Sequence, residues 1–190
     1  MSKTFFEGKT FEKIDFRNTP LEKGNYEHCR FLKCNFSGID IGTIQFSECT
    51  FSNCDLSLIK TTQTVFTNIE FVDCKLLGVN FDHCSNFIYG LEFENCMLNL
   101  SSFQGIKLKN TIWKSCSIQE VNFTGSDISG SIFSNCDLGK SIFMTTNLES
   151  CDFSSAYNFS IHPEKNKIKK AKFSLSGTIG LLDSYGINIV

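Results

Sequence analysis

The sequence of 190 residues predicts an all-β fold whose main part is a four-sided parallel β-helix. Three observations support this prediction: an apolar residue recurs at every fifth position, the cysteines all occupy one position of that period, and similar residues recur 20 positions apart. A helix would repeat its apolar residues near every 3.6 positions and a strand at every second one. Neither element alone explains a period of five.

The apolar series runs through most of the chain. It begins at Phe6 and reaches Phe81, slips by two residues, resumes at Ile88 and ends at Phe153. Only Thr61 within it is not apolar. Inward positions that alternate with outward ones describe short extended segments joined by tight corners. We therefore expect each five-residue segment to form one side of a solenoid coil.

The cysteines indicate how many sides a coil has. Cys34, Cys54 and Cys74 are 20 residues apart, which predicts that four segments close one coil and that like side chains stack on like. From Phe93 to Phe153 the central residues alternate between aromatic and aliphatic, so aromatic side chains should line two opposite walls. Coils at the usual strand spacing give a rod of roughly 36 Å. All ten cysteines lie two residues before a central position: Cys29, Cys34, Cys49, Cys54, Cys74, Cys84, Cys96, Cys116, Cys136 and Cys151.

Buried free thiols explain these cysteines better than a metal or redox site. Zinc ligands are typically paired two to four residues apart, whereas neighbouring cysteines here would lie on adjacent walls. Thiols stacked one coil apart would be about 4.8 Å from each other, beyond the usual Cβ separation of a disulfide. We expect no metal site and no cofactor. No phosphate loop, HExxH or GxSxG motif occurs, so no catalytic residue is predicted and a non-enzymatic protein is favoured.

The chain divides into two parts at the sequence level. Residues 1–156 form the predicted β-helix, with a phase break at 82–88 between two stacked segments, and residues 157–190 form a capping or dimerisation segment. This second part begins with a basic run, NKIKKAK, which is more typical of a solvated surface than of a nucleic-acid site. A short amphipathic helix is predicted from Ser174 to Tyr185, ended by Gly186, and it should cover the last coil.

Several repeats resemble the pentapeptide-repeat motif, namely a small residue, Asp or Asn, then Leu or Phe and two polar residues. Examples are Cys54-Asp55-Leu56-Ser57 and Cys151-Asp152-Phe153-Ser154-Ser155. This resemblance implies a right-handed quadrilateral β-helix. The phase break, from Cys84 to Glu92, is similar to a step in the Qnr-type, quinolone-resistance branch of the family.

The Qnr-type resemblance implies a protein that mimics DNA, binds DNA gyrase or topoisomerase IV and counters quinolones. The alternative is a rigid interaction scaffold with an unrelated partner. Members of this branch also dimerise through their closing segment, so a homodimer is expected. The residues expected at its interface are Leu175, Ile179, Leu182, Tyr185, Ile187 and Ile189.

Charge bears on the partner. Residues 1–160 carry 18 acidic and 13 basic side chains, too small an excess for mimicry through total charge. A sequence pI near 5.9 argues against direct binding of nucleic acid.

No apolar run spans a bilayer and the first residues carry no signal peptide, which predicts a cytoplasmic, non-membrane protein. The partner-facing surface is expected at five acidic residues around the phase break: Glu70, Asp73, Asp82, Glu92 and Glu94.

Overall fold

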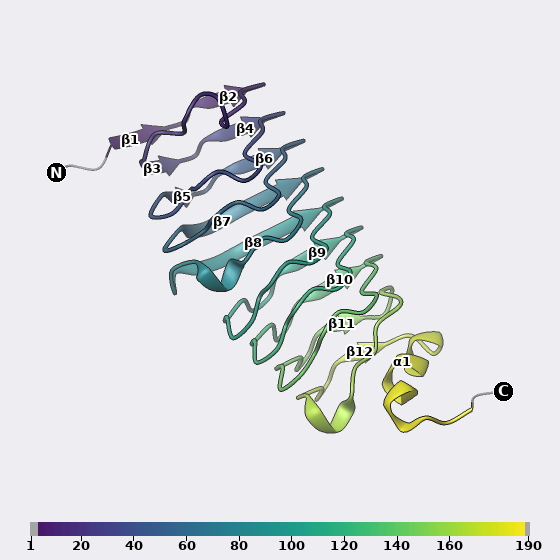
Figure 1. The fold of residues 1–190 in the computed structure, drawn as a ribbon. Coiled ribbons are helices and arrows are strands. Elements are labelled where there is room, and N and C mark those ends of the chain that lie inside the picture. Colours follow the sequence, from purple (N-terminus) through teal and green to yellow (C-terminus); the bar gives the residue numbers. More distant parts are fainter. Residues whose placement is uncertain (1–3, 189–190) are drawn as a thin grey trace.

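The computed structural model describes residues 4–188 as a stack of about eight coils, with a helical segment at the C-terminal end (Figure 1). All strands of the sheet pair in parallel, each with the strand one coil away. The fold is the right-handed quadrilateral β-helix predicted from the sequence. The strands are β1 (Thr4–Glu7), β2 (Thr10–Glu12), β3 (Gly24–Glu27), β4 (Arg30–Leu32), β5 (Gln45–Ser47), β6 (Thr50–Ser52), β7 (Val65–Val72), β8 (Ile88–Glu94), β9 (Ile112–Lys114), β10 (Ile132–Ser134), β11 (Asp152–Phe153) and β12 (Lys172–Phe173).

Each coil has four walls, which we number in chain order by their inward residues. In the coil that contains β5 and β6, the first wall carries Phe46 and the second carries Phe51, followed by Leu56 on the third and Thr61 on the fourth. Thr61 is the one polar member of the apolar series. Its buried hydroxyl donates a 2.5 Å hydrogen bond to the carbonyl of Asn80, so it is satisfied within the core.

Stacking keeps a register of 20 residues except at one place. Phe51 pairs with Phe71 at the usual offset, but Phe71 pairs with Phe93 and Phe66 with Ile88, an offset of 22. The two extra residues follow the short 3-10 helix η1 (Phe81–His83) and are accommodated at the corner that leads back to the first wall. Below this register step the offset returns to 20.

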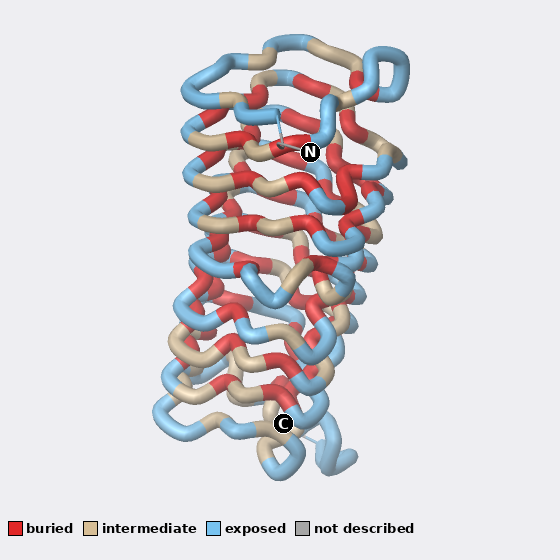
Figure 2. Tube along the Cα trace, turned by 90° about the vertical axis from the view of Figure 1, so that its left-hand side faces the viewer, coloured by how far each residue is buried: buried red, intermediate tan, exposed pale blue. Residues whose placement is uncertain are grey.

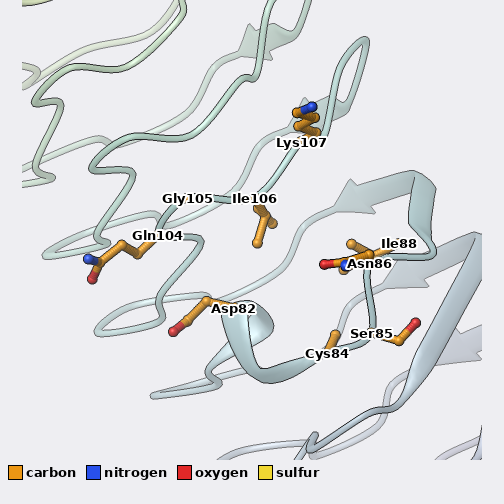
Figure 3. Close-up of a pocket in the computed structure, with 9 residues that line it drawn as sticks. All are labelled: Asp82, Cys84, Ser85, Asn86, Ile88, Gln104, Gly105, Ile106 and Lys107. Atoms are coloured by element: carbon orange, nitrogen blue, oxygen red, sulfur yellow. The ribbon is translucent and has the colours of Figure 1, made fainter.

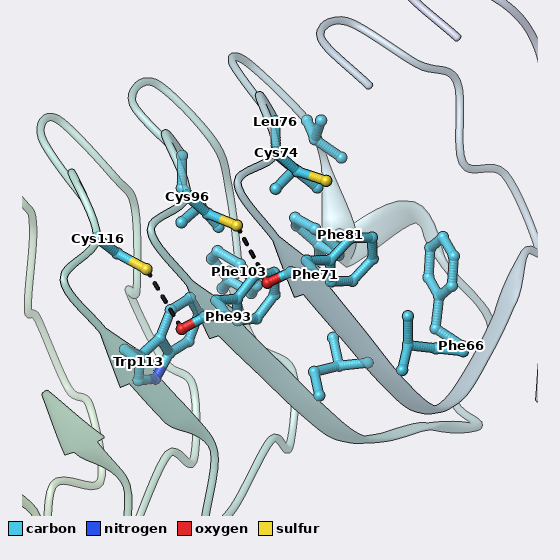
Figure 4. Packing of buried hydrophobic residues seen from close by; sticks show 14 of the residues in the cluster. Phe66, Phe71, Cys74, Leu76, Phe81, Phe93, Cys96, Phe103, Trp113 and Cys116 are labelled. Atoms are coloured by element: carbon cyan, nitrogen blue, oxygen red, sulfur yellow. Dashed lines mark hydrogen bonds between the residues drawn. The ribbon is translucent and has the colours of Figure 1, made fainter. Parts of the chain in front are cut away.

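The core is a continuous column of inward side chains, visible as the regular buried positions in Figure 2. Aromatic residues do occupy two opposite walls: Phe93 and Trp113 on the second wall meet Phe103 on the fourth, edge to face across the core (Figure 4). Within one wall the rings stack in parallel, as Phe93 does on Trp113 at 4.5 Å. Such a core combines large apolar burial with favourable aromatic geometry.

The cysteines are all buried and free, as expected from their place in the repeat. Apart from Cys84, each thiol donates a hydrogen bond to a backbone carbonyl. Cys96, for example, donates to the carbonyls of Phe71 and Glu94 at 3.3 Å each (Figure 4). Burial raises the pKa of Cys49, Cys84 and Cys151 to about 12. These thiols therefore act as small core residues and not as nucleophiles.

The coil path continues beyond residue 156, where the sequence boundary had been placed. Tyr157 bridges to Asp137, and β12 pairs with β11 at the same offset of 20. Between them lies the 3-10 helix η2 (Pro163–Lys165), and Ile161 is buried in the core. The repeat is hard to see here because the motif residues are replaced and the polar Asn166 occupies an inward position.

The C-terminal segment is helical from 176 to 185, in three short pieces, and not a single α-helix. Ser174 caps it, since its Oγ accepts a 3.0 Å hydrogen bond from the N–H of Gly177, and Gly186 ends it with φ 61°. The pieces are η3 (Ser176–Thr178), α1 (Ile179–Leu182) and η4 (Asp183–Tyr185).

This segment packs on the end of the rod through Gly180 and Leu181. A Cβ on Gly180 would lie 2.1 Å from the carbonyl oxygen of Phe159, so only glycine permits this approach. The Gly180 carbonyl in turn accepts a 2.9 Å hydrogen bond from the N–H of Ile161.

Candidate interaction surfaces

The register step brings part of the predicted acidic surface together. Glu70 on β7 and Glu92 on β8 are direct ladder partners on the second wall, with both side chains exposed. Asp73 lies at the corner after β7, with φ 53°, and is also exposed. These three acids and the neighbouring Glu94 therefore occupy one side of the rod.

The electrostatics differ between these acids. Glu94 is half-buried and forms a 2.6 Å ion pair with Lys114, one coil below. Glu70 and Glu92 have no basic group within 4.0 Å among residues 4–188, and Glu70 only accepts a 3.5 Å hydrogen bond from Thr50. Two like charges stacked directly in a ladder repel each other. The stacked pair is therefore an unneutralised negative site on the second wall.

Asp82 does not belong to this surface, contrary to the sequence-based expectation. It follows Phe81 on the fourth wall, whose ring meets Phe93 of the second wall edge to face across the core. Asp82 is thus on the opposite side of the rod from Glu70 and Glu92. Asp82 and Glu92 are ten residues apart, which is about half a coil. Residues separated by half a coil lie on opposite walls. The same spacing in the sequence could have revealed this.

Asp82 instead lines a cavity of about 480 Å³ at the register step (Figure 3). One rim comes from the segment after η1 and the other from the next coil, where the offset of 22 opens the stack. The far rim is not predicted from the sequence, although the seven-residue spacing between Phe81 and Ile88 is a signal for it. The lining residues are Asp82, Cys84, Ser85, Asn86, Ile88, Gln104, Gly105, Ile106 and Lys107.

This cavity lacks the chemistry of a thiol enzyme. Asp82, His83 and Cys84 are consecutive, and His83 Nε2 lies 3.9 Å from Asp82 Oδ2. However, burial raises the pKa of Cys84 to about 12, the opposite of what a nucleophilic thiol requires. No cluster of three or more metal-ligating side chains occurs within residues 4–188.

The apolar residues predicted at a dimer interface are exposed. Leu175 is 91% exposed, and Ile179, Leu182, Tyr185 and Ile187 range from 36% to 54%. Gly180 and Leu181 face the core instead, and Tyr185, although partly exposed, donates a 3.3 Å hydrogen bond from its hydroxyl to Glu164 in the last coil. Ile189 lies outside the described residues. Five exposed apolar side chains close together in the sequence are typical of an interaction site.

Three comparisons relate this molecule to known proteins. Residues 44–123 match the family model described as "Pentapeptide repeat region". The structure is similar to full-length QnrB1, a plasmid-mediated fluoroquinolone resistance protein, with a TM-score of 0.58 and 18% sequence identity over 97% of this chain and 100% of that one. At this identity the likeness shows the fold.

A weaker likeness is to HetL, a pentapeptide repeat protein involved in heterocyst differentiation regulation from the cyanobacterium Nostoc sp. strain PCC 7120. The TM-score is 0.35 at 12% identity, covering 90% of this chain and 88% of that one, and it supports no further argument. A search of curated protein sequences found no match. Within residues 4–188 no helix is both long and apolar enough to cross a bilayer.

Proposed function

We propose that this chain, which carries a pentapeptide-repeat region and folds as a Qnr-like solenoid, binds a type II topoisomerase as a DNA mimic. DNA gyrase is the first candidate and topoisomerase IV the second. By occupying the DNA site of the enzyme in the cytoplasm, the rod would protect it from quinolones. The coarser conclusion, a protein-interaction scaffold, rests on the fold itself.

The stacked pair Glu70 and Glu92 is the observation that carries the proposal. Elsewhere on this wall the chain neutralises an acid with a lysine one coil away, as in Glu94 with Lys114 and Asp152 with Lys172. At Glu70 and Glu92 it stacks two acids and keeps the repulsion. An acidic surface that keeps this electrostatic repulsion is complementary to a basic groove of the kind that binds DNA.

The rod offers a rigid surface for such a partner. Its coils are held by parallel ladders from β1 to β12 and by a continuous aromatic core. A preformed surface loses little conformational entropy on binding. The exposed apolar face of the helical segment suggests a two-fold dimer, in which two rods extend from a shared centre and lengthen the surface.

A supercoiling assay tests this function. Purified gyrase would be titrated with the protein, with and without ciprofloxacin. Rescue of supercoiling in the presence of the drug, or inhibition relieved by added linear DNA, is the expected result. If the protein has no effect on gyrase or topoisomerase IV, the topoisomerase proposal is wrong, and the scaffold has another partner.

A second candidate function is a scaffold for an unrelated protein, favoured by the cavity at the register step. The cavity is lined by carboxylate, amide and ammonium groups together with two isoleucines. It lies on the side of the rod away from the Glu70 and Glu92 pair. A partner that needs Asp82 and Gln104, and not the acidic pair, would support this alternative.

A further inference from the structure

The last coil of the rod carries five outward lysines in eight residues. The backbone here alternates: Asn166 and Ile168 point inward, where the Asn166 amide donates a 2.9 Å hydrogen bond to the carbonyl of Phe143 and Ile168 packs on the core. Lys167, which lies between them, therefore points outward. The lysine arc is Lys165, Lys167, Lys169, Lys170 and Lys172, all of them exposed.

The arc curves around one edge of the rod. Lys167 bridges to Asn147 on the first wall, Lys170 forms the corner with φ 61°, and Lys172 lies on the second wall in β12. Outward residues two positions apart in an extended chain are about 6.6 Å from each other. Positive charges thus follow one another along a single convex strip, a shape that a flexible or helical polyanion can track.

Few acids oppose this charge. Lys172 forms a 3.4 Å ion pair with Asp152, whereas the other four lysines have no carboxylate within 4.0 Å among residues 4–188. Glu149 lies in the coil above, beside Lys169 and Lys170, and Glu164 is turned toward Tyr185, whose hydroxyl donates to it at 3.3 Å. The end of the rod is basic although the chain as a whole is acidic.

We propose that the lysine arc is a binding site for the phosphate backbone of nucleic acid. Lysine ammonium groups without carboxylate partners are free to replace the counterions that condense on a duplex. No side chain in the arc offers a base-stacking or bidentate base contact, so binding should be independent of sequence. The low pI of the whole chain argues against binding of nucleic acid. However, the pI sums charge over all residues and does not reveal a local cluster of lysines.

This site is separate from the topoisomerase-binding surface and stands without it. The Glu70 and Glu92 pair lies in the coils that meet at the register step, whereas the arc lies in the last coil of the rod. The DNA test below contains no topoisomerase, so its failure would not affect the proposed function, and failure of the supercoiling assay would not affect this site.

The test is fluorescence anisotropy of a labelled 30-base-pair duplex titrated with the full chain. At about 50 mM salt we expect a Kd on the order of 10 µM, and the affinity should fall by more than about 100-fold at 200 mM. The slope of log Kobs against log salt should lie near −4, about −0.9 for each lysine contact. Duplexes of different sequence should bind equally.

Charge reversal identifies the residues. The triple variant Lys167→Glu, Lys169→Glu and Lys170→Glu should lose at least about 30-fold in affinity. A matched control changes the net charge equally at exposed lysines on other coils, with Lys33, Lys60 and Lys75 each replaced by Glu, and should bind within about threefold of the unmodified chain. Thermal unfolding would confirm that both variants fold.

Three results would overturn the proposal. The first is the absence of binding at 50 mM salt with protein up to 100 µM. The second is an equal loss in both triple variants, which would mean that only net charge matters. The third is a preference for vesicles of anionic lipid over DNA, with the exposed apolar residues of the helical segment required, which would assign the arc to a membrane surface.

Discussion

Glu70 and Glu92 are stacked directly on one another in adjacent coils, although 22 residues separate them and not the usual 20. The register step therefore does more than interrupt the repeat. It sets which residues of the two segments become neighbours, and on the second wall it places two acids together without a basic partner among residues 4–188. We interpret this pair as the centre of the partner-binding surface.

Reversing one charge of this pair should separate binding from stability. Glu92→Lys replaces repulsion with an attractive pair, so the protein should gain about 0.2–1 kcal/mol in unfolding free energy. The same change should weaken topoisomerase binding by at least about tenfold, since it removes charge from the proposed surface. Urea unfolding and binding measurements on one preparation test both effects.

Asp82→Lys is the matched control for that experiment. It also reverses an acidic residue next to the register step, but on the opposite wall. Topoisomerase affinity should stay within about twofold. If Asp82→Lys weakens binding as much as Glu92→Lys does, the partner-binding surface has been placed on the wrong side of the rod.

Core packing gives a second prediction. Phe123 is fully buried and stacks between Phe103 at 5.4 Å and Phe143 at 5.1 Å. Phe123→Ala should cost about 3–5 kcal/mol through lost burial and a cavity. Ile142→Ala, at a side chain that is 51% exposed, should change stability by less than about 0.5 kcal/mol. A loss under 1 kcal/mol for Phe123→Ala would contradict the inward register.

The thiols provide a third prediction. Because burial raises the pKa of Cys84 to about 12, almost no thiolate forms there at pH 8.5. All ten cysteines are buried, so iodoacetamide should label the folded protein very slowly and the denatured protein completely. Mass spectrometry of alkylated peptides measures this. Rapid labelling of Cys84 in the folded protein would show an accessible, activated thiol at the register step.

Asp152 predicts how stability responds to acid. Hydrogen bonds from the hydroxyl and N–H of Ser154, with Lys172 nearby, hold the pKa of this carboxyl below its ordinary value of 3.8. The folded state therefore gains stability above pH 3.8, and this gain is lost as the pH falls through the lower folded pKa. Asp152→Asn should be less stable at pH 7 and less sensitive to acid below pH 4. An unchanged pH profile would argue against these contacts.

The helical segment gives a prediction about oligomeric state. Leu182→Glu combined with Ile179→Glu should convert a dimer to a monomer without unfolding the rod, since both side chains are exposed. Leu58→Glu, on an exposed apolar residue far from the segment, is the control. Light scattering coupled to size exclusion measures the mass. A monomeric unmodified protein would contradict the proposed dimer.

Much of the fold could be predicted because one physical rule repeats. A period of five places Phe93 and Phe103 on opposite walls, and a coil of 20 residues stacks Cys34 on Cys54. The structure has both arrangements. The coil from Tyr157 to Phe173 was harder to recognise because Asn166 replaces the small residue of the motif. This side chain is tolerated inside because its amide donates to the carbonyls of Phe143 and His162 and its oxygen accepts from the N–H of Thr146, and these contacts depend on the tertiary fold.

The candidate surfaces were predicted less completely. The sequence identified Glu70 and Glu92 as outward, but the pairing between them depends on where the two extra residues are accommodated. Treating Asp82 as part of one acidic patch ignored the half-coil spacing. How the helical segment packs could not be predicted, since it depends on the close approach of Gly180 to Phe159 at the end of the rod.

The central claim, that the rod occupies the DNA site of a type II topoisomerase, is tested most directly by competition. Binding of labelled protein to purified gyrase would be measured against increasing linear duplex DNA, at a salt concentration that suppresses direct contact between the protein and DNA. We expect the apparent Kd to rise linearly with the DNA concentration. Binding to gyrase that DNA leaves unchanged would contradict the account.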